Sequence, residues 1–236
     1  MKFKTVFIVA LMATIWSIEA SCQGCKPVTF DGYTYDVVQI GNQCWFAENL
    51  RTEHYANGDE IPGDLSNEEW ELTDLGARAV YGEGESFREE LLANLNTYGG
   101  LYKWYAVDDA RGLCPTGWHV PTDEEWMTLE MELGMSESEA KKGGWRGTDQ
   151  GKQMKSSPSN DPSWYGTNTS GFSALAGGYR NSSGNFHDGG YYGYFWSSSP
   201  DGADAWGRLL FIGGAGVERD SYNRRLGFSV RCVRDE

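Results

Sequence analysis

The second half of the chain consists of short aromatic and aliphatic runs separated by glycine, serine and asparagine. After Gly143 these runs read GFSALAGGYR, YFWSSS, WGRLLFI and GFSVRCV. Turn-forming residues at such short intervals are typical of strands of a few residues joined by turns. We therefore expect this half of the chain to fold into many short strands.

The N-terminal part contains a hairpin signal. Asp31-Gly32 lies between two stretches that alternate apolar and polar residues, near Val28 to Phe30 and Tyr33 to Ile40. Both central residues of a two-residue hairpin turn need positive φ, and Asp-Gly adopts it readily. We expect a second turn at Gly41-Asn42 to lead into a strand from Cys44 to Glu48.

Helix signals cluster in the middle of the chain, in RGLCPTGWHVPTDEEW. Thr122 is a good N-cap, Glu125 follows at the third helical position, and apolar residues come next at i, i+3 and i+7. This pattern predicts an amphipathic helix over residues 123–133 that ends at Gly134. The capping pattern recurs at Ser136 and predicts a second short helix.

A strand hairpin, one or two helices and then many short strands define an α+β domain. A chain of 236 residues without a linker fits one domain, which we place at residues 28–236. Within it, residues 57–95 are acidic, rich in glycine and poorly periodic, apart from a short capped helix predicted at Ser66. We expect this segment to be a long, partly ordered insertion.

The N-terminus has the composition of a signal peptide over residues 1–21. Two lysines precede an apolar run from Val6 to Ile18, which is too short for a permanent membrane anchor, and small residues follow. Cleavage after Ala20 and lipoprotein cleavage before Cys22 both fit, and residues 22–27 then form a tether. We expect an extracytoplasmic protein, either secreted or a periplasmic or outer-membrane lipoprotein.

The cysteine count bears on the same choice. Five cysteines are an odd number for an oxidising compartment. Lipidation of Cys22 leaves four, enough for two disulfides: Cys25, Cys44, Cys114 and Cys232.

The net charge limits the partners. A formal charge of −14 at pH 7 repels phosphate backbones and anionic headgroups. We expect no nucleic-acid partner, and membrane contact only through the lipid anchor. The sequence specifies no oligomeric state.

Six blocks carry a family resemblance, and in chain order they read VQIGNQCWFAENL, GGLYKWYAV, LCPTGWHVPTDEEW, SGFSALAGGYR, FWSSS and GFSVRCV. Together they resemble the Fibrobacter succinogenes major paralogous domain, an extracytoplasmic family common in Bacteroidetes-type bacteria, from about Val28 to Arg234. The resemblance implies a surface or periplasmic protein, often a lipoprotein, of no established activity.

HVPTDEEW and GFSVRCV are also similar to blocks of the formylglycine-generating enzymes, which implies a C-type-lectin-like fold. Such folds commonly tie the central helix segment to the last strand, which implies a Cys114–Cys232 disulfide and leaves Cys25 to pair with Cys44. Those enzymes need a pair of reactive cysteines near the C-terminal blocks, where only Cys232 is present. We therefore do not expect an oxidase.

No other motif points to catalysis or a cofactor. An H-E-x-x-H helix, a G-x-S-x-G elbow and a P-loop are absent from the sequence. We expect no cofactor; the alternative is calcium, which lectin-like folds often hold. Candidate ligands in NSSGNFHDGG and SPDGADAW match no defined calcium loop, and turn chemistry explains them as well: Asn181, Asn185, Asp188, Asp201 and Asp204.

The most suggestive ligand-binding feature is NFHDGGYYGYFWSSS. Its candidate site residues are His187, Asp188, Tyr191, Tyr192 and Tyr194. Aromatic faces beside polar groups suit sugar rings and protein partners. Alternation along YGYFWS predicts that half of these rings belong to the core.

Arginines concentrate near the C-terminus of this acidic chain, at Arg208, Arg219, Arg224, Arg225 and Arg231. One interpretation is a site for an acidic glycan. The favoured interpretation is interstrand pairing with Glu218 and Asp220.

Together these patterns favour a non-catalytic recognition or adhesion module that binds a glycan or a surface protein. The alternatives are a structural cell-envelope protein without a specific ligand and a carbohydrate-active enzyme. Exposed tyrosines around a groove would favour binding, and their complete burial would favour the structural class. Two carboxyl groups facing each other across a cleft would favour the enzyme.

Overall fold

The computed structural model describes residues 24–84 and 86–235. Within these ranges the chain forms six short helices and four antiparallel sheets, which confirms the α+β class. The finer C-type-lectin-like assignment stays a prediction. The predicted signal peptide and the lipidation site at Cys22 lie outside the described residues. No described helix is both long and apolar enough to span a bilayer.

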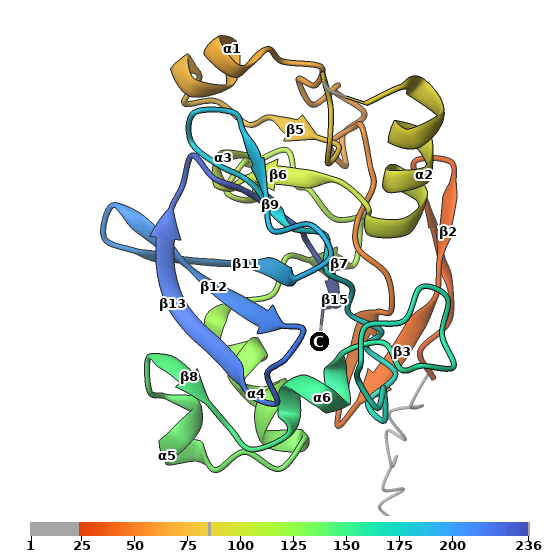
Figure 1. Ribbon diagram of the computed structural model, residues 1–236, viewed down its shortest axis with the longest axis vertical. Coiled ribbons are helices and arrows are strands. Elements are labelled where there is room, and N and C mark those ends of the chain that lie inside the picture. The colour runs from red at the N-terminus through yellow and green to blue at the C-terminus, as the bar shows by residue number, and fades with distance from the viewer. Residues whose placement is uncertain (1–23, 85, 236) are drawn as a thin grey trace, which may run out of the picture.

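The longest strands lie in a four-stranded antiparallel sheet across the middle of the molecule (Figure 1). In spatial order its strands are β11 (Tyr192–Asp201), β12 (Asp204–Phe211), β13 (Val217–Asn223) and β8 (Gly144–Arg146). Both faces of this sheet are covered along β11 and β12, because Phe195 and Leu210 belong to one hydrophobic cluster and Trp196 and Ala205 to the other.

The other strands are two to four residues long, as the turn-rich texture predicts. One sheet contains, in spatial order, β10 (Phe186–His187), β9 (Tyr179–Arg180), β14 (Gly227–Phe228), β6 (Leu101–Lys103) and β5 (Arg78–Ala79). Another contains β3 (Val37–Ile40), β4 (Gln43–Phe46), β15 (Val233–Arg234) and β7 (Trp118–His119).

The N-terminal hairpin pairs β1 (Val28–Phe30) with β2 (Tyr33–Tyr35). Its turn residues Asp31 and Gly32 have φ values of 48° and 76°, as the Asp-Gly signal predicts. The single strand predicted from Tyr33 to Ile40 is wrong. The chain changes partner at Asp36, because β2 pairs with β1 whereas β3 pairs with β4.

The helices are short and lie toward the two ends of the molecule's long axis, α1 and α2 at one end and α4 to α6 at the other (Figure 1). Their bounds are α1 (Asn67–Leu72), α2 (Arg88–Tyr98), α3 (Trp104–Val107), α4 (Asp123–Glu132), α5 (Glu137–Ala140) and α6 (Gln150–Met154). The predicted capping box of Thr122 and Glu125 is present at the start of α4. Ser66 and Glu69 form a second box at α1.

Residues 57–84 and 86–95 are more ordered than their composition predicts. They contain α1, β5 and most of α2, and β5 pairs with β6 as an edge strand. Trp70 of α1 is fully buried, and the Arg180 guanidinium lies 4.4 Å from its ring centroid. The acidic side chains cover the outside while this tryptophan anchors the segment, so composition alone was misleading here.

A buried ionic network joins α4 to the central sheet. Arg208 of β12 contacts both Asp123 and Glu130 of α4, each at 2.7 Å. Arg146 of β8 reaches Glu130 at 2.6 Å, and Arg219 of β13 reaches Asp123 at 2.6 Å. Each carboxylate therefore receives two guanidinium groups, which compensates the cost of burying the charges.

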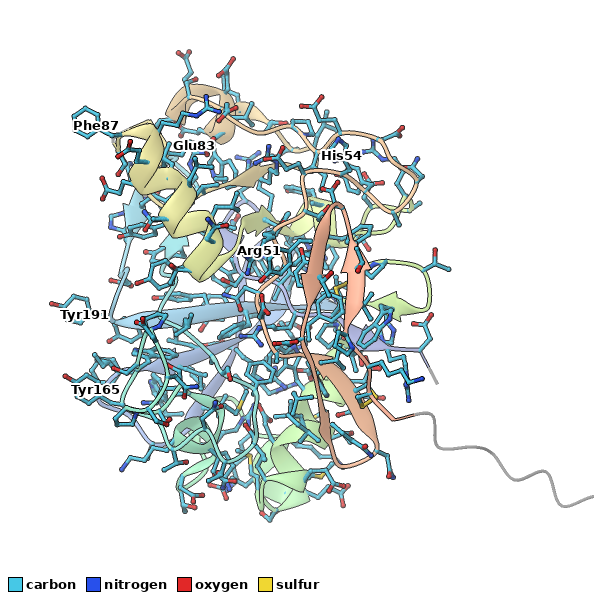
Figure 2. All side chains as sticks on the ribbon, turned by 90° about the vertical axis from the view of Figure 1, so that its right-hand side faces the viewer. Arg51, His54, Glu83, Phe87, Tyr165 and Tyr191 are labelled. Atoms are coloured by element: carbon cyan, nitrogen blue, oxygen red, sulfur yellow. A yellow bond between two sulfur atoms is a disulfide. The ribbon has the colours of Figure 1, made fainter. Side chains whose placement is uncertain are left out.

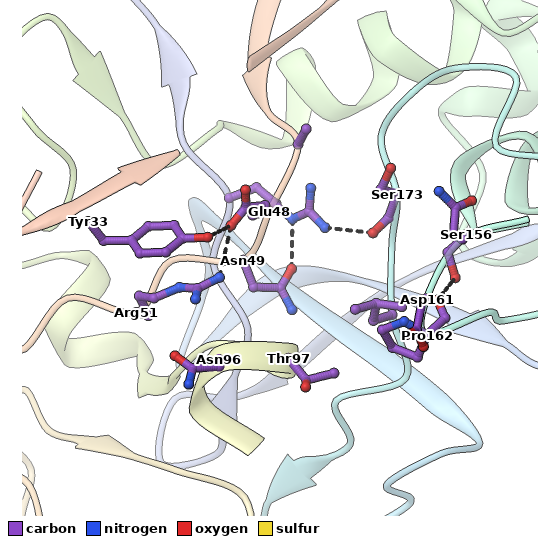
Figure 3. A pocket seen from close by; sticks show the side chains of 14 residues that line it. Tyr33, Glu48, Asn49, Arg51, Asn96, Thr97, Ser156, Asp161, Pro162 and Ser173 are labelled. Carbon is purple, nitrogen blue, oxygen red and sulfur yellow. Dashed lines mark hydrogen bonds and ion pairs between the residues drawn. The ribbon is translucent and has the colours of Figure 1, made fainter. Parts of the chain in front are cut away.

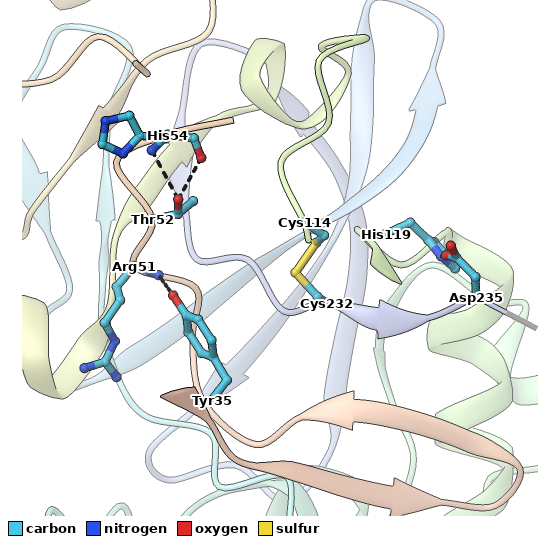
Figure 4. The surroundings of a disulfide bond; sticks show 8 residues. All are labelled: Tyr35, Arg51, Thr52, His54, Cys114, His119, Cys232 and Asp235. Atoms are coloured by element: carbon cyan, nitrogen blue, oxygen red, sulfur yellow. Dashed lines mark hydrogen bonds and ion pairs between the residues drawn. A yellow bond between two sulfur atoms is a disulfide. The ribbon is translucent and has the colours of Figure 1, made fainter. Parts of the chain in front are cut away.

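Both predicted disulfides are present in the structure, Cys25–Cys44 and Cys114–Cys232. Cys232 precedes β15 directly and Cys114 lies just before β7, so the second bond links the starts of two paired strands (Figure 4). This bond lies within the larger hydrophobic core.

Candidate functional site

The structure does not bring the five predicted ligand-binding residues together on one exposed surface. His187 ends β10 and is exposed, with its Nε2 2.9 Å from the Asn181 amide nitrogen. Tyr191 is 62% exposed and projects from the edge of the molecule (Figure 2). It is the only one of the four rings Tyr191, Tyr192, Tyr194 and Trp196 that is this accessible.

The other rings of this segment pack into the fold. Trp196 is fully buried and stacks on Phe228 with centroids 4.2 Å apart. Tyr194 donates a hydrogen bond to Asp188 at 2.7 Å, and burial raises its pKa well above the usual value. Tyr192 is half-buried and stacks on Phe211. The alternation along β11 therefore places most of the segment in the core. The hydrogen bond from Tyr194 to Asp188 holds the preceding turn against this strand.

A groove made of three adjoining hollows lies beside this turn. The first hollow has a volume of about 320 Å³, the second about 40 Å³ and the third about 250 Å³. The first and second share Pro162 and Leu175, and the second and third share Tyr98, Ala176 and Gly190, so the three lie in a row. We call this row the groove.

The groove is built where segments far apart in sequence meet. Most of its walls come from the irregular segment after β4, from α2, from the loop at residues 156–164 and from the segment at residues 173–177. The loop is fixed by Ser156, whose hydroxyl donates to the Pro162 carbonyl at 3.0 Å. Just before it, the buried Lys155 ammonium donates to three backbone carbonyls, so the loop is anchored at its start.

Polar side chains line the first hollow (Figure 3). Asn96 and Thr97 come from α2, and Asn160 comes from the loop. At one side Glu48 accepts hydrogen bonds from the Tyr33 hydroxyl at 2.5 Å and from Arg51 Nη2 at 2.8 Å. Burial and the Glu48 contact raise the pKa of Tyr33. Hydroxyl and amide groups of this kind can exchange hydrogen bonds with the hydroxyls of a sugar.

Arg231 forms part of the wall of the first hollow and is 1% exposed. Its guanidinium donates only to neutral oxygens, those of the Asn49 side chain and of the Phe46, Phe172 and Ser173 carbonyls. Burial lowers its pKa to about 9. Asn49 in turn donates to the Tyr98 carbonyl at 2.8 Å, so this contact connects Arg231 to the end of α2.

The second hollow contains an unused donor. Trp164 lines it and is 2% exposed, yet its indole N–H has no hydrogen-bond acceptor among the described residues. A buried N–H without a partner is costly. The next residue, Tyr165, is 71% exposed and projects from the same edge as Tyr191 (Figure 2).

The late arginines do not pair as predicted. Arg208 and Arg219 bind carboxylates of α4 rather than Glu218 or Asp220, because β12 and β13 place these two arginines directly opposite each other over the helix. Arg225 binds Asp74 at 2.8 Å and Arg224 donates to backbone carbonyls. Only Arg231 of this group lines the groove.

The described residues contain no cluster of three or more His, Cys, Asp or Glu side chains that could hold a metal ion. Three of the candidate calcium ligands accept hydrogen bonds within the chain: Asn181 from the Asn185 backbone at 2.9 Å, Asn185 from the Asn67 amide at 3.3 Å, and Asp188 from Tyr194. Asp201 and Asp204 are paired where β11 turns into β12.

Sequence reasoning missed most of the groove. Asn96 and Thr97 lie on a helix that has no side-chain N-cap, since Phe87 precedes it, and so no start signal was visible. Asn160 sits in a loop of serine and asparagine that resembles any surface turn. The one available signal was Arg231, an arginine directly before a cysteine within an apolar strand pattern.

The fold and the groove define a disulfide-linked α+β domain with an elongated polar surface site. The chain belongs to the Fibrobacter succinogenes major domain family, whose sequence model matches residues 38–234. This match confirms the family predicted from the six blocks. No curated protein and no solved structure matches the chain significantly.

Proposed function

We propose that the protein is an extracytoplasmic, non-catalytic recognition module that binds a glycan along the groove. The observation that carries the proposal is the row of three hollows lined by amide, hydroxyl and guanidinium groups. An elongated polar groove suits a chain of sugar rings, each of which presents several hydroxyls. The exposed rings of Tyr165 and Tyr191 beside it offer stacking faces.

Two further features support the location and the absence of catalysis. The disulfides favour an oxidising compartment. Of the two carboxyl groups that line the first hollow, Glu48 is engaged by Tyr33 and Arg51, whereas Asp161 is exposed. A glycosidase needs two carboxyl groups placed on either side of the scissile bond. Binding without turnover therefore fits the groove better than hydrolysis does.

The test is an array of plant, mucin and bacterial glycans probed with the full chain and with an Asn96→Ala, Asn160→Ala variant. Both side chains line the first hollow, and Asn96 is exposed on a helix, where alanine is well tolerated. We expect the variant to lose the signal, while Asn57→Ala, an exposed asparagine outside the groove, retains it.

Other outcomes would redirect the proposal. Loss of binding in Tyr191→Ala with full binding in the groove variant would move the site to the tyrosine turn. Silence across the array would contradict glycan recognition and favour a structural envelope protein, for which the packed rings of Tyr194 and Trp196 are the supporting feature.

A further inference from the structure

The four buried arginines differ in their partners. Arg146, Arg180 and Arg208 each lie within ion-pair distance of a buried or nearly buried glutamate or aspartate. Arg231 is equally buried, yet no carboxylate of the described residues lies within that distance of it. It is also the only one of the four that lines the groove.

The neutral partners of Arg231 leave donor capacity unused. A guanidinium has five N–H groups, and Arg231 makes four hydrogen bonds, one of them a long 3.3 Å contact from Nη2 to the Ser173 carbonyl. Its charge is desolvated by the core and faces the Phe172 ring at 4.4 Å. No carboxylate contacts this buried cation directly, and the charge of Glu48 offsets its burial only in part.

A second cation in the same hollow also has a free donor. Arg51 lies over the Tyr33 ring at 3.7 Å and bonds Glu48 through Nη2. Its Nε is buried and has no hydrogen-bond acceptor among the described residues. Both arginines line the first hollow, whose wall also contains the amide and hydroxyl groups of Asn49, Asn96, Thr97, Ser156 and Asn160.

We propose that the first hollow binds the carboxylate of an acidic sugar, a hexuronate unit of the glycan, with Arg231 and Arg51 as its cationic partners. The inference rests on the proposed function and specifies the ligand class. Guanidinium groups bind carboxylates through charge-assisted hydrogen bonds, which are stronger than neutral ones. Asn96, Thr97 and Asn160 can then form hydrogen bonds with the hydroxyls of the sugar ring. A simple carboxylate or a peptide C-terminus has no ring hydroxyls and would leave these three side chains without ligand contacts.

The remaining charges of the hollow are compatible with this assignment. Glu48 is neutralised by Arg51 and hydrogen-bonded by Tyr33. Asp161 is exposed, so water screens its repulsion of an incoming anion. Removing either carboxylate should strengthen the binding of an acidic sugar. If Arg231 had only a structural role, removing these carboxylates would not change the affinity in this direction.

The experiment compares oligomers of galacturonate, glucuronate and mannuronate with their methyl esters by calorimetry on the full chain. Esterification removes the charge and keeps the ring stereochemistry. We expect at least one acid to bind about tenfold tighter than its ester, as one charge-assisted hydrogen bond would produce. Asp161→Asn should tighten the acid more than the ester; its exposed side chain makes this variant safe for folding.

A charge-balanced pair isolates Arg51. Glu48→Gln alone should tighten the acid, and adding Arg51→Gln to it should weaken the acid about tenfold and the neutral ester by less. Arg231→Lys is less suitable, because Arg231 bonds to segments that also hold the fold together.

The outcomes separate the two proposals. Equal affinity of acid and ester, with groove-dependent binding of neutral glycans, would overturn the hexuronate inference and leave glycan recognition intact. Binding of a peptide carboxylate without any hexuronate would also overturn it. Binding of no glycan, acidic or neutral, would overturn both.

Discussion

His119 is placed where it can hold the end of the chain. Its Nδ1 lies 2.6 Å from Asp235, beside which Figure 4 draws it. Its Nε2 lies 2.8 Å from Glu125. The hydrogen bond to Glu125, opposed by partial burial and reinforced by Asp235, raises the pKa of His119 to about 9. The Glu125 carboxylate also caps α4, so one charged histidine connects the C-terminal strand to the helix start.

This pKa predicts a dependence of stability on pH. Because the folded-state pKa is above the unfolded value of 6.5, the stabilisation is complete below that value and disappears as the pH rises through about 9. We expect His119→Gln to lower the urea midpoint at about pH 6 and to have little effect at about pH 9.5.

Only the difference between wild type and variant is informative, because the buried ammonium groups of Lys103 and Lys155 also titrate in this range. Burial lowers the pKa of each to about 8, so their deprotonation acts in the opposite direction. His187→Gln is the matched control, since His187 is exposed and has no carboxylate partner among the described residues. An equal loss in His119→Gln at both pH values would show that the contact does not depend on protonation.

Two helices begin with the same capping box in different surroundings. Ser66 with Glu69 starts α1 on the surface, whereas Thr122 with Glu125 starts α4, which packs on the central sheet. In each box a side-chain hydroxyl accepts from the third backbone N–H, at 3.2 Å in both. The pair therefore separates the contribution of the cap from that of its environment.

We expect Ser66→Ala to lower the free energy of unfolding by about 0.5 to 1 kcal/mol and Thr122→Ala by about 1 to 2 kcal/mol. The larger loss at Thr122 follows because its hydroxyl also holds the Glu125 carboxylate that binds His119. Equilibrium urea unfolding of both variants measures the difference. A loss at Ser66 equal to that at Thr122 would contradict the coupling between cap and histidine.

Local signals predicted those elements whose cause is local. The Asp31-Gly32 turn, the Thr122 cap and the Ser66 cap act within a few residues, and each is where the sequence placed it. The break at Asp36 and the helix α2 were missed. A change of strand partner depends on residues far along the chain, and α2 has neither a cap nor a fully buried side chain to reveal it.

At the scale of the whole molecule, the groove was beyond the reach of sequence patterns. Arg231 reaches Asn49 and Phe172, partners that are 182 and 59 positions away. The tyrosine turn was recognised as a feature, but its rings mostly fill the core because β11 alternates between two buried surfaces. A site assembled from many separated segments has a chemical identity only after the chain has folded.

The two disulfides restrain the whole molecule to different extents. Cys114–Cys232 closes a loop with a sequence separation of 118, which contains α4, the central sheet and half of the groove. Cys25–Cys44 closes a separation of only 19 at the N-terminal hairpin. In the chain-entropy model a closed loop stabilises by restricting the unfolded chain, and the effect grows with the logarithm of its length.

We therefore expect Cys114→Ala with Cys232→Ala to lower the free energy of unfolding by about 5 kcal/mol, and Cys25→Ala with Cys44→Ala by about 3 kcal/mol. Urea unfolding of both double variants under non-reducing conditions measures the two losses. The first pair also leaves space in the main core, which adds to its cost. A larger loss from the N-terminal pair would mean that the first hairpin, which carries Tyr33 into the groove, is held mainly by its disulfide rather than by packing.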